Sequence, residues 1–133
     1  ELEECILNVA ISPGIVSVSV HPYYNGGIAH ALFYGLTCRK HIEKHHLHGE
    51  VVSYGTLVNL MVDQNMEKLK LAYDFNKEVG LPTCLADLEL EKDDPLEDVL
   101  RITMENQELT HTPYPVDAKM IHEAILKLED YRG

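Results

Sequence analysis

Histidine is the residue type in this sequence with the clearest capacity for chemistry, because eight histidines occur in 133 residues. Five of them fall within one stretch of nineteen residues: His30, His41, His45, His46 and His48. Imidazole is a common metal ligand, so this density raises the question of a metal site. His41 and His45 are four residues apart and would share one face of a helix. Their charged neighbours Lys40, Glu43 and Lys44 favour an exposed pair without a metal.

His30 and His48 lie among small or apolar residues, so both side chains are expected to point inward. In one unbroken helix the two rings would stand about 27 Å apart, too far to share an ion. The stretch 45–49 has no helical apolar pattern and contains a glycine, which predicts a chain reversal between Lys44 and Glu50. Two antiparallel helices could then present both imidazoles to one metal ion. The alternative is two buried histidines that are hydrogen-bonded to backbone carbonyls.

Two histidines leave a metal site incomplete, because a catalytic zinc ion usually has three protein ligands. Within this chain the candidates for a third ligand are Glu50, Asp63 and Asp87, and none has a distinctive context. Glu50 is also explained by its place at the start of a helix, where a negative charge is favourable.

Charge and cysteine content exclude several classes of protein. Eleven Lys and Arg against 22 Asp and Glu give a net charge of -11, which argues against nucleic acid and anionic membrane surfaces as partners. No apolar run approaches the roughly 20 residues that span a bilayer. Three widely spaced cysteines form no disulfide framework and indicate a reducing, cytoplasmic location. The sequence contains no glycine-rich nucleotide motif of its own.

The periodicity of apolar residues predicts an all-α fold for a single domain, residues 1–133. Ser12-Pro13-Gly14 is expected to end a first helix, and for residues 15–20 strand and helix are equally supported. A proline directly after Asp94 predicts a capped helix start there. Helices are expected at 1–10, 28–44, 51–63, 66–79, from Asp94 to about 106, and from Asp117 onward.

Several segments resemble the C-terminal half of glycerol dehydrogenases. They read NGGIAHA at 25–31, GLT at 35–37 and LHGEVVSYGTLV at 47–58. GLPTCLADL at 80–88 and YPV at 114–116 agree as well. The resemblance implies a helical metal-binding domain, as in the NAD-dependent polyol dehydrogenases of the iron-containing alcohol dehydrogenase superfamily.

In that family one aspartate and two histidines hold Zn2+ or Fe2+, and the histidines correspond to His30 and His48. The aspartate and the N-terminal NAD-binding domain lie upstream, so the resemblance implies a fragment that is inactive alone. The chain also begins at Glu1, within an expected helix and without an initiator methionine, which fits this interpretation. The implied substrate is a small polyol, with Tyr23 near the position of a substrate contact. The full-length protein is expected to be a homo-oligomer.

The sequence departs from the family pattern at two places. Two residues are missing between the glycine pair and His30, and Phe33-Tyr34 stands where the family usually has His-Asn. Two alternatives therefore stay open. One is a lyase domain related to dehydroquinate synthase, which shares the HGE segment, and the other is a non-catalytic helical interaction module.

Overall fold

The computed structural model describes residues 1–19 and 26–133, and these residues are helical or irregular, with no strand. The predicted all-α fold is confirmed. In chain order the helices are α1 (Leu2–Ser19), α2 (Ile28–Leu36), α3 (Lys40–His45), α4 (His48–Val62), α5 (Met66–Val79), the 3-10 helix η2 (Leu85–Leu88), α6 (Glu97–Glu105), the 3-10 helix η3 (Gln107–His111) and α7 (Ala118–Asp130). Within these ranges no helix has the length and apolar character needed to cross a membrane.

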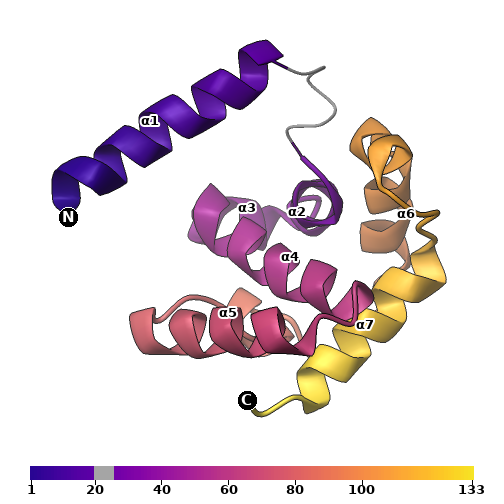
Figure 1. Cartoon of the computed structure of the whole chain (residues 1–133). Coiled ribbons are helices and arrows are strands. Elements are labelled where there is room, and N and C mark those ends of the chain that lie inside the picture. The colour runs from indigo at the N-terminus through magenta and orange to yellow at the C-terminus, as the bar shows by residue number, and fades with distance from the viewer. Residues whose placement is uncertain (20–25) are drawn as a thin grey trace.

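Helix α4 is the central element of the fold, and α2, α5 and α7 pack against it (Figure 1). Its buried side chains include Tyr54, Leu57 and Val58, which form part of the main core. Two predicted helix boundaries are confirmed. Gly80 ends α5 with a φ of 76°. At the start of α7 the Asp117 carboxylate accepts a hydrogen bond from the Met120 N–H.

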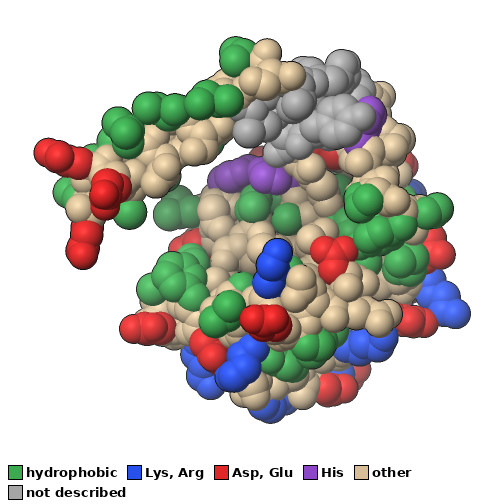
Figure 2. All heavy atoms as spheres, viewed as in Figure 1, with side chains coloured by type: hydrophobic (Ala, Val, Ile, Leu, Met, Phe, Trp, Pro, Cys, Tyr) green, Lys and Arg blue, Asp and Glu red, His purple; other side chains and the backbone are tan. Residues whose placement is uncertain are grey.

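Helix α1 lies apart from the other helices (Figure 1). The prediction that Ser12-Pro13-Gly14 ends the first helix is wrong, because α1 continues through Pro13 to Ser19. A strand here would need a partner strand for its backbone N–H and C=O groups, and the described residues offer none. A helix pairs most of these groups internally, although Pro13 removes one hydrogen bond. Exposed apolar side chains run along α1 (Figure 2).

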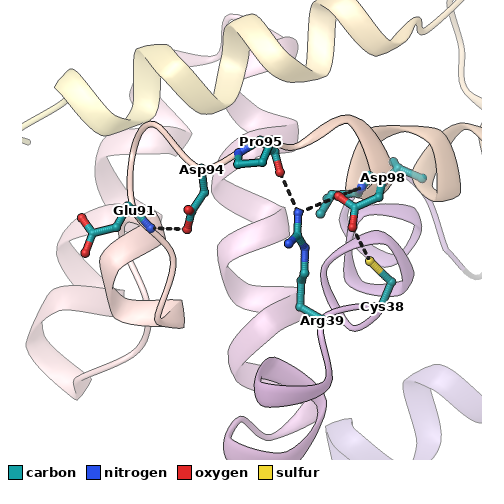
Figure 3. A network of polar contacts seen from close by, with 8 residues as sticks. Cys38, Arg39, Glu91, Asp94, Pro95 and Asp98 are labelled. Atoms are coloured by element: carbon teal, nitrogen blue, oxygen red, sulfur yellow. Dashed lines mark hydrogen bonds and ion pairs between the residues drawn. The ribbon is translucent and has the colours of Figure 1, made fainter.

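The single helix predicted at 28–44 is wrong, because the chain breaks between α2 and α3. The Thr37 hydroxyl donates to the Phe33 carbonyl oxygen at 2.8 Å, and Arg39 is extended. The Arg39 guanidinium donates to the Pro95 carbonyl and to Asp98, both at 2.7 Å (Figure 3). These contacts attach the end of α2 to the start of α6.

The start of α6 also differs from the prediction, because the helix begins at Glu97 and no side chain caps it. Asp94 instead accepts a hydrogen bond from the Glu91 N–H at 2.8 Å (Figure 3). Desolvation pushes the pKa of Asp98 upward, but the Val99 N–H and the Arg39 guanidinium hold it below its ordinary value.

Two glycines let α2 approach its neighbours closely. A Cβ atom on Gly55 of α4 would lie 2.6 Å from the Ala29 carbonyl oxygen, and one on Gly35 of α2 would lie 2.5 Å from the Val99 carbonyl oxygen. A larger residue at either position would force backbones apart. The glycines thus set the distance from α2 to α4 and to α6.

Candidate metal centre

The structure brings His30 and His48 together. His30 lies in the first turn of α2 and His48 is the first residue of α4, and their ring centroids are 5.5 Å apart at an interplanar angle of 45°. The predicted reversal between Lys44 and Glu50 is present, since α3 ends at His45 and α4 begins three residues later. Helices α2 and α4 run in opposite directions, because Ala29 meets Gly55 whereas Phe33, one turn later, meets His48.

Local contacts fix the position of His48. The Glu50 carboxylate accepts a hydrogen bond from the Leu47 N–H at 2.8 Å and so caps the start of α4. The Phe33 ring meets the His48 ring edge-on, with centroids 4.4 Å apart. The aromatic residue at position 33 therefore restricts the orientation of one imidazole.

The donor set fits a metal ion. A ligating imidazole nitrogen lies about 2.0–2.1 Å from zinc, so two rings that share a tetrahedral ion have centroids about 5 Å apart. The observed separation of 5.5 Å agrees with this value. Neither imidazole has a hydrogen bond to another described residue, so the alternative of rings held by backbone carbonyls finds no support in this part of the chain. His30 is half-buried and His48 is exposed.

No third protein ligand joins this pair among residues 1–19 and 26–133, where no group of three suitable side chains is found. Each of the predicted candidates has a local role. Glu50 caps α4, and Asp87 accepts hydrogen bonds from the Thr83 and Cys84 N–H groups. Asp63 lies at the far end of α4 and accepts a hydrogen bond from the Tyr114 hydroxyl.

The other histidines of the predicted cluster do not join the pair. His45 forms an ion pair with Glu89 at 2.9 Å, and His46 lies 3.6 Å from Glu50 and 3.7 Å from Glu89. His45 is thus engaged by Glu89, whereas His41, which was expected to be exposed, is half-buried. Tyr23, the predicted substrate contact, lies outside the described residues.

A cleft of about 420 Å³ opens beside His30. Its walls come from the start of α2, from one side of α4 and from residues 108–114. Three of its polar residues were missed by sequence reasoning: Glu108, His111 and Tyr114. No local pattern could have revealed them, because they meet α2 only through the tertiary fold. Desolvation and the hydrogen bond to Asp63 raise the pKa of Tyr114 to about 12, so this hydroxyl stays protonated at neutral pH.

A second hollow, of about 350 Å³, borders His48. Phe33, Tyr34 and Thr37 line it from α2 and the following turn. The imidazole pair thus lies between two hollows, one beside each ring.

Comparison with known proteins identifies relatives of this chain. No family model matches it. A glycerol dehydrogenase from Thermotoga maritima is 35% identical over 115 residues, which cover 82% of this chain and 31% of the relative. One from Citrobacter freundii is 38% identical over 104 residues, with 74% and 28% covered. The chain is homologous to the C-terminal part of glycerol dehydrogenases. It spans about a third of the length of these curated relatives.

A solved structure agrees with the sequence relatives. The crystal structure of a probable glycerol dehydrogenase from Sinorhizobium meliloti 1021 superposes with a TM-score of 0.70 at 30% identity. The match covers 78% of this chain and 30% of that one. The helical fold described above therefore matches the helical part of that probable glycerol dehydrogenase.

Proposed function

We propose that this chain is the C-terminal helical part of a metal-dependent, NAD-linked polyol dehydrogenase, in which His30 and His48 are two of the metal ligands. The pairing of these rings, 5.5 Å apart and without hydrogen bonds to the described residues, carries the proposal. Homology to glycerol dehydrogenases supplies the reaction class.

The third ligand and the nucleotide-binding domain belong, in this proposal, to a part of the parent protein that precedes Glu1. Glycerol dehydrogenases are about three times as long as this chain, which leaves room for both. No third ligand is found among the described residues, which agrees with a metal site whose ligands come from two parts of the parent protein. The chain then forms one wall of an active site between two domains.

The chemistry of such a site follows from charge. A Zn2+ or Fe2+ ion, when bound, lowers the pKa of an alcohol hydroxyl and so favours hydride transfer from the adjacent carbon to the nicotinamide ring. The neutral imidazoles of His30 and His48 supply lone pairs without cancelling the ion's charge. Phe33 holds one imidazole in place, and the cleft beside His30 receives the alcohol.

The cleft itself argues against a phosphate-bearing substrate, such as the one used by dehydroquinate synthases. Among the described residues that line it there is no Lys or Arg, while Asp63 and Glu108 carry negative charge. The first turn of α2 lines the cleft, and a helix N-terminus favours an anion. Phosphate recognition normally adds cationic side chains, however, and the acidic pair is found here instead. A neutral alcohol therefore fits this cleft better.

Metal binding can be tested on the 133-residue chain by NMR of its histidine side chains during titration with Zn2+. We expect the His30 and His48 resonances to shift together and to saturate at one ion per chain. H30A should abolish the shift at His48, and H48A the shift at His30. H122A is the matched control, because His122 is exposed on α7, away from the pair. Independent shifts of the two rings would contradict the shared ion.

The same substitutions test the parent protein. We expect purified parent to contain one Zn2+ or Fe2+ per chain and to reduce NAD+ in the presence of glycerol or a vicinal diol. H30A and H48A should lose metal and activity together. A metal-loaded parent that oxidises no diol would overturn the proposed function.

A further inference from the structure

The cleft beside His30 contains a carboxylate that the metal pair does not use. Glu108 lines this cleft, and its Oε2 atom is buried without a hydrogen-bond partner among the described residues. No lysine or arginine from these residues lines the cleft, although the imidazole of His111 does. A buried carboxylate oxygen without a partner is costly, because its desolvation is not repaid. Such a group is typical of a site that a ligand completes.

The fold holds Glu108 against the backbone that leads into α2. A Cβ atom on Gly26 would lie 1.8 Å from Oε2 and 2.2 Å from Cδ of Glu108, so the carboxylate packs directly against the Gly26 backbone, and a side chain there would displace it. The Asn106 side chain accepts a hydrogen bond from the Glu108 N–H at 2.9 Å, and the next residue, Leu109, is buried. The carboxylate therefore lies against Gly26, which precedes His30 by four residues, and both Glu108 and His30 line the same cleft.

The partner that Glu108 lacks must be a hydrogen-bond donor without negative charge. The other carboxylate of the cleft, Asp63, already accepts the Tyr114 hydroxyl proton, which leaves Glu108 as the acceptor to be satisfied. An anionic ligand would be repelled by both carboxylates. An alcohol with one hydroxyl would use that group at the reacting centre and leave Glu108 unpaired. A polyol has a second hydroxyl to donate.

We propose that Glu108 is a substrate-binding residue that accepts a hydrogen bond from a hydroxyl of a neutral polyol, adjacent to the hydroxyl oxidised at the His30–His48 pair. This inference rests on the proposed function. It makes Glu108 a determinant of specificity for polyols over alcohols with a single hydroxyl.

The test compares glycerol with 2-propanol as substrates of the metal-loaded parent, in wild type, E108A and E108Q. We expect E108A to raise KM for glycerol about tenfold or more, with little change in kcat or in kcat/KM for 2-propanol. E108Q should give a smaller rise, because the carboxamide oxygen still accepts but carries no charge. E105A is the matched control, since Glu105 is exposed, pairs with Arg101 and does not line the cleft.

Stability gives a second readout, measured on the 133-residue chain by thermal unfolding. E108Q should leave Tm unchanged or raise it, because the carboxylate has no partner to lose. A large loss of stability in both variants would show that Glu108 has a structural role and would overturn the inference. Equal effects on both alcohols, or none, would overturn it while the proposed function stands. A metal-loaded wild-type parent that oxidises neither alcohol would overturn the proposed function and this inference with it.

Discussion

At the scale of single residues, the spacing of the imidazole pair depends on a residue that has no side chain. Gly55 touches the backbone of Ala29, one residue before His30, and a methyl group there would lie 2.6 Å from a carbonyl oxygen and 2.9 Å from a Cα atom. A backbone cannot rotate away as a flexible side chain can. We therefore consider Gly55 as important for the metal pair as the residues that contact its rings.

We expect G55A to destabilise the chain by about 1–3 kcal/mol, because α2 must move away from α4. Urea unfolding followed by circular dichroism measures this change. G49A is the matched control: Gly49 also lies in α4, its Cβ would meet nothing within 4 Å, and alanine favours helix. Equal stability of the two variants would contradict the close approach of the helices.

At the scale of elements, α1 contributes little to the stability of the rest of the chain. Its described side chains are exposed, including Leu2, Val9 and Val18 at 74%, 75% and 86%. We expect deletion of residues 1–19 to change the free energy of unfolding by less than about 0.5 kcal/mol, because little apolar area leaves the core. Urea unfolding of the shortened chain tests this. A loss above about 2 kcal/mol would show that α1 packs against the other helices.

The elements also show what the sequence can and cannot predict. Apolar periodicity located α4, α5 and α7, because each buries one face against a neighbour. The meeting of His30 and His48 was predictable because the reversal between them is local. The break after α2 could not be predicted from the local sequence, because Arg39 at this break donates a hydrogen bond to Asp98, 59 residues away. The cleft residue Glu108 stayed unnoticed for the same reason.

At the scale of the whole molecule, the described residues carry the imidazole pair on one continuous helical core. The core is continuous from α2 through α4 to α7, and the two helices that carry the imidazoles both belong to it. In the proposed function the third metal ligand comes from elsewhere, because no group of three suitable side chains is found among residues 1–19 and 26–133. Under the proposed function, the folding of this chain can therefore be separated from the catalysis of the parent protein.

This separation gives a last prediction. The 133-residue chain, mixed with Zn2+, NAD+ and glycerol, should form no NADH, because the proposed third ligand and nucleotide-binding domain lie outside it. Its affinity for Zn2+ should be at least about 100-fold weaker than that of the parent, since loss of a ligand costs more than loss of a supporting contact. Absorbance at the NADH band and competition with a zinc chelator measure the two quantities. Steady NADH formation by the chain alone would place the whole active site within these residues, and the two-histidine pair would then have to be sufficient to hold the ion.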